Sequence, residues 1–188
     1  DKENVIIYDY VDNHIPMFDN MYAKRLKAYK QIGYELACGL QIGKQTVNAI
    51  YDWDNYSTYY HKDLLGANNN IIISSPVISG PKVYELINLL KEKQMSGVQI
   101  TIVTWAPDSY RFGDAAYWMQ LHEDMRQAGF YIKTVEESCE RFAVIDQEVV
   151  WYGNINLLAK DKVDDSIMRI LSKEIASELM EITFGDNG

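Results

Sequence analysis

Residues 139–156 read CERFAVIDQEVVWYGNIN, and the interpretation of the whole chain starts from this stretch. Its polar residues follow a fixed spacing, which is Cys139-x-Arg141-x4-Asp146-x6-Gly153-Asn154-x-Asn156. A strand around Cys139 would point Cys139 and Arg141 the same way, because side chains at alternate positions of a strand share a face. A second strand is predicted from Val149 to Tyr152. The pattern therefore predicts a thiol beside a guanidinium.

This spacing resembles the signature H-x-K-x4-D-x6-G-[GS]-x-N of the phospholipase D-like superfamily. In that family the His attacks phosphorus, the Lys and Asn hold the phosphate oxygens, and the Asp orients the partner of the His. The resemblance places Cys139 at the His, Arg141 at the Lys and Asn154 at the small residue. It implies catalytic positions at Cys139, Arg141 and Asp146, and phosphate-binding positions at Arg141, Asn154 and Asn156.

The replaced nucleophile makes an inactive site the favoured interpretation. The reaction that the resemblance implies needs two motif copies across a two-fold axis, so a chain with one copy would need a symmetric homodimer. Residues 135–148 contain five acids and one base, which disfavours both a thiolate and an incoming phosphodiester. We expect Cys139 to be a small buried side chain and Arg141 to pair with Asp146. Catalysis by a Cys139 thiolate beside Arg141 remains the alternative.

Apolar runs and helical periodicity alternate through the chain, which predicts an α/β sandwich. The order and the strings IIISSPVIS, GVQITIVT, WYGNINLL and SIMRI resemble a phospholipase D-like domain with a mixed, largely parallel sheet flanked by helices. Helices are predicted near 56–67, 80–90, 114–128 and 173–182, and strands near 71–75, 99–104, 130–134, around Cys139, 149–152 and 167–171.

The first part of the chain has a different resemblance. Residues 4–36 are similar to the last strand and helix of the motor in DEAD/DEAH-type helicase-like proteins that carry a phospholipase D-like domain after the motor. The resemblance implies a domain boundary, with residues 1–47 as motor remnant and linker and residues 48–188 as the phospholipase D-like domain. It assigns ATP and magnesium only to an upstream motor, and no cofactor or metal to this chain.

Three local patterns invite a functional interpretation that the spacing does not support. Gly39-x3-Gly43-Lys44-Gln45-Thr46 is one residue too short for a phosphate loop and has Gln45 where a hydroxyl is needed. His61-Lys62-Asp63 are adjacent, so a strand cannot aim them at one site, and a helix is predicted there. Aromatic residues cluster between 51 and 60, where packing on the core is favoured over stacking on bases.

Charge and cysteine content exclude other classes. The net charge of −9 argues against non-specific affinity for nucleic acid. The basic cluster of Lys24, Arg25, Lys27 and Lys30 is typical of a solvated helix face. Two distant cysteines predict neither a disulfide framework nor a zinc site. Without a long apolar run or a signal-peptide pattern, we expect a cytoplasmic protein with no membrane partner.

Together these features predict a catalytically degenerate phospholipase D-like accessory domain of a DNA helicase-like protein. Its expected roles are dimerisation, recognition of the phosphate backbone of DNA, or both. One alternative is an active metal-independent phosphodiesterase or nuclease formed across a homodimer. The other is an interaction module that has no contact with DNA.

Overall fold

The computed structural model describes residues 48–110, 113–136, 139–159 and 165–185. The helicase-like segment, the domain boundary at residue 47, the glycine-rich segment 39–46 and the basic cluster lie outside this part of the chain. Its strands are β1 (Ala49–Asp52), β2 (Asn70–Ser74), β3 (Gln99–Trp105), β4 (Tyr131–Val135), β5 (Phe142–Ile145), β6 (Val149–Gly153) and β7 (Ser166–Leu171). Its helices are α2 (Tyr56–Gly66), α3 (Gly80–Met95), α4 (Ala115–Gln127) and α5 (Lys173–Phe184).

The four helices predicted near 56–67, 80–90, 114–128 and 173–182 are present within a few residues of their expected ends, whereas the helix predicted between Phe18 and Ile32 lies outside the described residues. Their starts follow from local chemistry: Asp114 accepts a hydrogen bond from the backbone N–H of Ala116, and Ser172 accepts one from that of Ile175. Such caps satisfy backbone donors that a first helical turn leaves unpaired. Strand β1 was not predicted, because its four residues become a strand only by pairing with β7, more than a hundred residues away.

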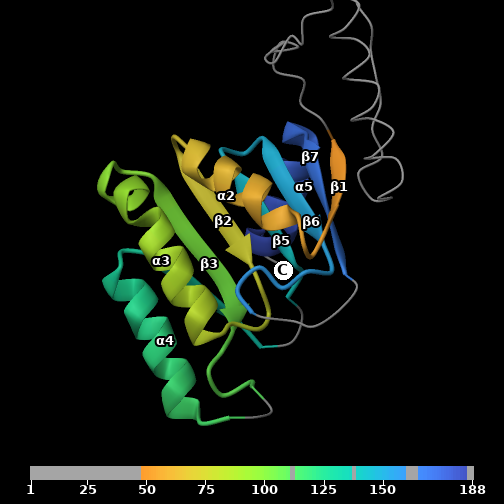
Figure 1. Ribbon diagram of the computed structural model, residues 1–188. Helices are drawn as coiled ribbons and strands as arrows, with labels where there is room; N and C mark the ends of the chain where they lie inside the picture. Colours follow the sequence, from red (N-terminus) through yellow and green to blue (C-terminus); the bar gives the residue numbers. More distant parts are fainter. Residues whose placement is uncertain (1–47, 111–112, 137–138, 160–164, 186–188) are drawn as a thin grey trace, which may run out of the picture. The chain divides into compact units, whose positions relative to one another are not determined.

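The seven strands form one mixed sheet in the order β1-β7-β6-β5-β2-β3-β4 (Figure 1). The α/β class and the mixed sheet are therefore confirmed. The expectation of a largely parallel sheet is wrong, because only β2–β3 and β3–β4 are parallel and the other four pairings are antiparallel. Helices α3 and α4 supply the two long crossovers that parallel pairs need. Apolar runs alone do not reveal strand direction.

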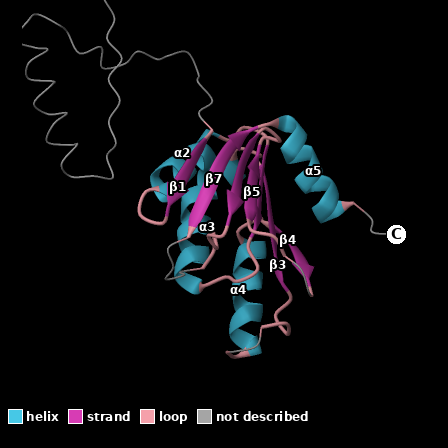
Figure 2. Cartoon of the chain, turned by 90° about the vertical axis from the view of Figure 1, so that its right-hand side faces the viewer, coloured by secondary structure: helices cyan, strands magenta, loops and turns pink. Residues whose placement is uncertain are grey.

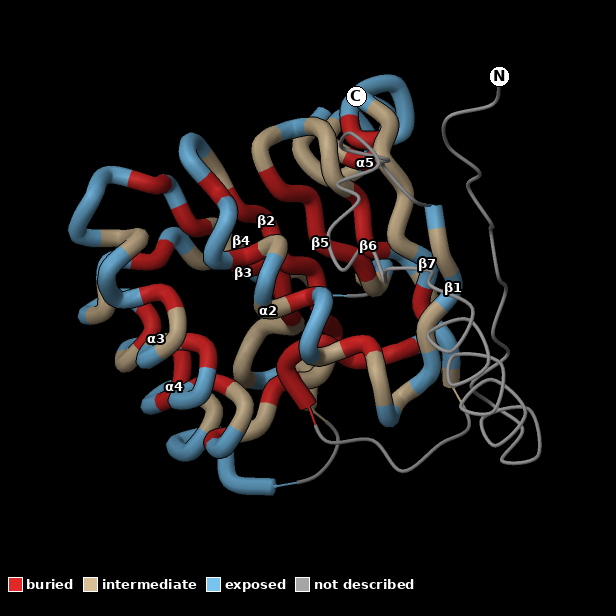
Figure 3. Tube along the Cα trace, turned by 45° about the horizontal axis from the view of Figure 1, so that its top comes forward, coloured by how far each residue is buried: buried red, intermediate tan, exposed pale blue. Residues whose placement is uncertain are grey.

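Helices α2, α3 and α4 cover one face of the sheet and α5 lies on the other (Figures 1 and 2). Alternating residues of β2 face the two sides: Ile71 and Ile73 belong to the core under α2–α4, and Ile72 to the core under α5. Figure 3 shows the buried positions along the strands and on the inner sides of the helices. Two apolar layers therefore hold the sheet from both sides.

The aromatic residues between 51 and 60 mostly serve the core, as expected. Tyr56 and Tyr60 are 3% exposed, and the ring of Tyr60 meets that of Trp151 edge-on at 5.5 Å. Tyr59 is the exception, with about half of its surface exposed. Within the described ranges, none of the helices has the length and apolar character that crossing a membrane requires.

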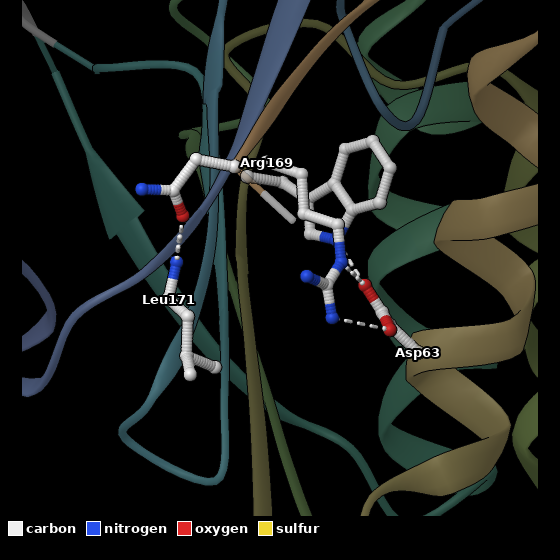
Figure 4. Close-up of polar contacts among 5 residues, drawn as sticks. Asp63, Arg169 and Leu171 are labelled. Carbon is white, nitrogen blue, oxygen red and sulfur yellow. Dashed lines mark hydrogen bonds and ion pairs between the residues drawn. The ribbon is translucent and has the colours of Figure 1, made fainter. Parts of the chain in front are cut away.

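The His61-Lys62-Asp63 segment lies on α2, as predicted, and Asp63 has a structural task. Its carboxylate accepts two hydrogen bonds from the guanidinium of Arg169, at 2.6 and 3.0 Å, and one from the indole N–H of Trp151 at 2.9 Å. Figure 4 shows the side chain of Arg169 on β7 pointing toward Asp63 on α2. In the same view, the backbone N–H of Leu171 donates to the side-chain oxygen of Asn48.

Candidate functional site

The motif residues are distributed along the β5–β6 hairpin and the loop that follows it. The hairpin closes through a tight turn in which Asp146 and Gln147 have φ of 52° and 54°, and the N–H of Glu148 donates to the carbonyl of Ile145. At the open end, the N–H of Gly153 donates to the carbonyl of Arg141 at 3.3 Å. Folding thus brings Arg141 next to Gly153 and leaves Asp146 at the far end.

Arg141 and Asn156 form the one direct side-chain contact that the structure records between motif positions. The Nε of Arg141 donates to Oδ1 of Asn156 at 3.1 Å, and Asn156 is 3% exposed. Among the residues that the structure describes, the two terminal nitrogens of this guanidinium form no hydrogen bond or ion pair. A planar guanidinium held at Nε keeps a pair of donors for an oxyanion.

Asp146 does not pair with Arg141, so the expected ion pair is wrong. Its carboxylate instead accepts the backbone N–H groups of Asn68, Asn69 and Asn70 at 2.9, 2.8 and 3.1 Å. The reason is distance: the strand residues between the two positions each advance about 3.3 Å. Burial raises the pKa of Asp146, but the three backbone donors together outweigh burial and hold the pKa below its usual value.

Cys139 precedes β5 and lies on the α5 side of the sheet. Its Sγ is 3.4 Å from the hydroxyl of Ser74 and 3.8 Å from the carbonyl of Val103, and it packs against the core under α5. Ala143 and Ile145, which alternate with Phe142 along β5, face the opposite core. Arg141 lies just before β5, and its Nε donates to Asn156. The predicted strand around Cys139 is wrong, because β5 begins only at Phe142, but Arg141 is near enough to lower the pKa of Cys139.

The surroundings of Cys139 keep its thiol protonated. Burial has the largest effect and raises the pKa of Cys139; the hydrogen bond with Ser74 lowers this pKa, Glu140 raises it and Arg141 lowers it by smaller amounts. The thiol borders a cavity of about 240 Å³ whose walls include Ser74, Lys133 and Ile182 but not Arg141. A neutral thiol is a weak nucleophile, because the thiolate is the attacking form.

The glycine of the motif is required by the close approach of β7. A Cβ at Gly153 would lie 2.7 Å from the Cα of Ile167 and closer still to the carbonyl oxygen of Ser166. Asn154 is exposed, and its backbone N–H donates to that same carbonyl at 3.1 Å. Among the described residues, the side chain of Asn154 forms no hydrogen bond with Arg141 or Asn156, so Asn154 adjoins this pair through its backbone position.

The two histidines in the described part of the chain lie away from the hairpin. His61 lies on α2 beside Glu85, with 3.6 Å between Nε2 and the carboxylate, and His122 is buried on α4. The described residues hold no group of three His, Cys, Asp or Glu side chains that could bind a metal ion. Sequence reasoning missed Ser74, which borders the thiol; the signal was a Ser-Ser pair ending a buried apolar strand.

These features, an α/β sheet with helices on both faces and a hairpin carrying the spaced motif, agree with comparisons to known proteins. The model of a family described as cardiolipin synthase, PLD-like domain, matches residues 60–184. The chain belongs to this phospholipase D-like family. No curated protein matches the sequence.

Solved structures with the same fold include two bacterial proteins. Nuc from Salmonella typhimurium, a phospholipase D family member, has a TM-score of 0.58 at 14% identity, over 72% of this chain and 90% of its own. NucT from Helicobacter pylori has a TM-score of 0.55 at 10% identity, over 72% and 92%. TrmBL2, an archaeal chromatin protein whose structure shows a novel mode of DNA binding, reaches 0.50 at 11% identity, over 87% and 59%.

Proposed function

We propose that this domain binds phosphodiester groups of DNA through Arg141 and Asn156 and does not cleave them. The observation that carries the proposal is the hydrogen bond from Arg141 Nε to Asn156 Oδ1, which orients a guanidinium whose terminal nitrogens have no partner among the described residues. Two parallel N–H donors match two phosphate oxygens. Contacts of this kind position a protein on the backbone and carry no sequence information.

The lack of turnover is proposed from the placement of the motif residues. The position at which the family resemblance expects a nucleophile is Cys139, whose thiol packs into the core under α5, whereas Arg141 bonds to Asn156. Burial raises the pKa of this thiol, which lowers the fraction of the thiolate that an attack would need. An attack on a phosphate held by Arg141 would therefore require a nucleophile other than Cys139. Neither His61 on α2 nor His122 on α4 lies on the β5–β6 hairpin.

DNA is the proposed ligand because a fold neighbour is a DNA-binding chromatin protein and others belong to the phospholipase D family. The acidic composition sets the strength that we expect. With a net charge of −9, the chain offers few phosphate contacts, so binding should be weak and should depend on salt with a shallow slope. Such a domain would position DNA for another activity rather than capture it.

The proposal extends to assembly. A symmetric homodimer would bring two copies of Arg141 and Asn156 together, and a helicase-like motor in the same polypeptide would supply ATP-dependent movement. Both remain proposals derived from the sequence. The cytoplasmic placement is likewise proposed. A metal-independent nuclease that uses Cys139, and an interaction module without DNA contact, are the two functions that experiments should separate from this one.

The decisive experiment measures binding of labelled single- and double-stranded DNA to the full chain by fluorescence anisotropy at several salt concentrations. Arg141→Gln should weaken binding to every sequence and reduce the salt slope by about one, since one phosphate contact is lost. Arg126→Gln is the matched control, because Arg126 is an exposed arginine on α4 that is 3.8 Å from Glu123. Equal binding by the wild type and Arg141→Gln would support the interaction module instead.

The same DNA substrates, incubated with a chelator, test for turnover. We expect no cleavage by the wild type and none by Cys139→Ser. Metal-independent cleavage that disappears in Cys139→Ser would replace the proposed function with the nuclease alternative, since phospholipase D-like chemistry runs through a protein nucleophile.

A further inference from the structure

The loop that carries Asn156 is buried although it has no regular secondary structure. Ile155, Asn156 and Leu158 are 0%, 3% and 1% exposed, and they lie in neither a helix nor a strand. Buried backbone without helix or sheet partners must find its hydrogen bonds elsewhere. The position of Asn156 therefore depends on contacts that other segments make with this loop.

Among the hydrogen bonds that hold the loop, two lie on either side of Asn156 at equal distance in sequence. On one side, the N–H of Asn154 donates to the carbonyl of Ser166 at the start of β7. On the other side, the N–H of Leu158 donates to the hydroxyl of Ser75 at 3.3 Å. Each of these two bonds is two residues from Asn156, so a shift at either end moves its amide.

The hydroxyl of Ser75 both accepts and donates a hydrogen bond. It accepts from Leu158 and donates its own proton to the carbonyl of Val77 at 2.9 Å, and Ser75 is 0% exposed. Its backbone N–H donates to the carbonyl of Val103 at 2.9 Å, which fixes Ser75 to the end of the sheet. A side chain bonded on both sides in a buried place has one orientation open to it.

We propose that Ser75 is a positioning residue for the oxyanion site: through Leu158 it sets Asn156, and through Asn156 it sets the plane of the Arg141 guanidinium. This inference rests on the proposed binding of phosphodiesters. The Arg141 side chain loses less conformational entropy on binding DNA when its Nε is already hydrogen-bonded, because the direction of its two terminal donors is then fixed before binding. Ser75 would act without touching the ligand.

Ser79 provides a matched comparison, because it lies with Ser75 in the segment between β2 and α3. Its backbone N–H donates to the carbonyl of Leu158 at 2.7 Å, while its hydroxyl is at 3.4 Å from the same oxygen. Ser79→Ala keeps the shorter bond, since a backbone group forms it. Ser75→Ala removes the hydroxyl that accepts the Leu158 N–H. The two substitutions delete the same atom from residues four positions apart in sequence.

The test compares DNA affinity of full-length variants at one salt concentration, with labelled duplex DNA as the probe. Ser75→Ala should weaken binding by roughly three- to tenfold, and Ser79→Ala by less than about twofold. In an Asn156→Ala background, Ser75→Ala should have no further effect, because the two residues act in series. A folded Ser75→Ala protein with wild-type affinity, or equal effects in both backgrounds, overturns the inference.

A spectroscopic measurement separates positioning from loss of stability. The Nε–H resonance of Arg141, which reports its bond to Asn156, should shift and exchange faster in Ser75→Ala, but not in Ser79→Ala; an unchanged resonance counts against the inference. If Ser75→Ala does not fold, Ser75→Cys, which keeps the volume but accepts hydrogen bonds weakly, takes its place in both experiments. Wild-type affinity in Arg141→Gln would instead refute the proposed function itself.

Discussion

Arg141 and Asp146 lie at opposite ends of β5 and belong to different hydrogen-bond networks. Arg141 bonds to Asn156 in the loop after β6, and Asp146 accepts three backbone N–H groups at the start of β2. One motif therefore divides into a part that forms the proposed oxyanion site and a part that stabilises the fold. Substitutions should affect the two parts separately.

Asp146→Ala should destabilise the domain by about 2 kcal/mol, since it leaves three backbone donors without their charged acceptor. The check is urea unfolding, with Asp108→Ala, which removes an exposed carboxylate, as the control. Because the folded pKa of Asp146 is lowered, its contribution is present above the usual carboxyl pKa of 3.8 and is lost as the pH falls through the folded value. An equal effect of both substitutions would contradict this role.

Cys139 should react slowly with iodoacetamide at neutral pH. Burial raises its pKa, so the thiolate fraction is smaller than in a cysteine peptide, and access from solvent is partial. The measurement uses a Cys38→Ser background, with the same protein in urea as the reference. The alkylation rate of the folded protein should begin to rise at a higher pH than the alkylation rate of a cysteine peptide. A rate at pH 7 that equals or exceeds the unfolded rate would show an activated thiol.

Asp63→Ala should cost about 3 kcal/mol, because it leaves the half-buried Arg169 guanidinium and the indole N–H of Trp151 without a partner. Replacing both charges, as in Asp63→Leu with Arg169→Met, should cost less than the single substitution. Thermal or urea unfolding measures both. A double variant that is less stable than Asp63→Ala would contradict this expectation. It would show that the ion pair itself stabilises the fold by more than the cost of leaving Arg169 unpaired.

The stability of the domain should fall between pH 7 and pH 4 through His122. Burial lowers its pKa from 6.5 to about 4, with a smaller contribution from Arg126, and neither ring nitrogen has a hydrogen-bond partner among the described residues. The unfolded chain binds this proton more readily, so the stabilisation is present above pH 6.5 and is lost as the pH falls, by up to about 3 kcal/mol. His122→Leu should flatten that dependence in urea unfolding, whereas His61→Gln should not. A pH profile that stays unchanged in His122→Leu would assign the loss to other groups.

Local pattern was enough to predict β2, α3 and α5, because each has its own apolar face or its own cap. It was not enough for β1, which exists only because it pairs with β7. The local sequence pattern also could not predict strand direction, since β2 has a parallel neighbour in β3 and an antiparallel one in β5. The residue spacing at 139–156 pointed correctly to a phospholipase D-like chain, which the family model matches over residues 60–184.

The sequence by itself determined the class of fold and the residues that could meet a phosphate, since these depend on residue type and spacing. The tertiary structure alone decided which of them meet. It joined Arg141 to Asn156, sent Asp146 to the start of β2, and placed Cys139 under α5. The physical reason is that the face of a side chain depends on whether its backbone lies within a paired strand, and residues 139–141 precede β5.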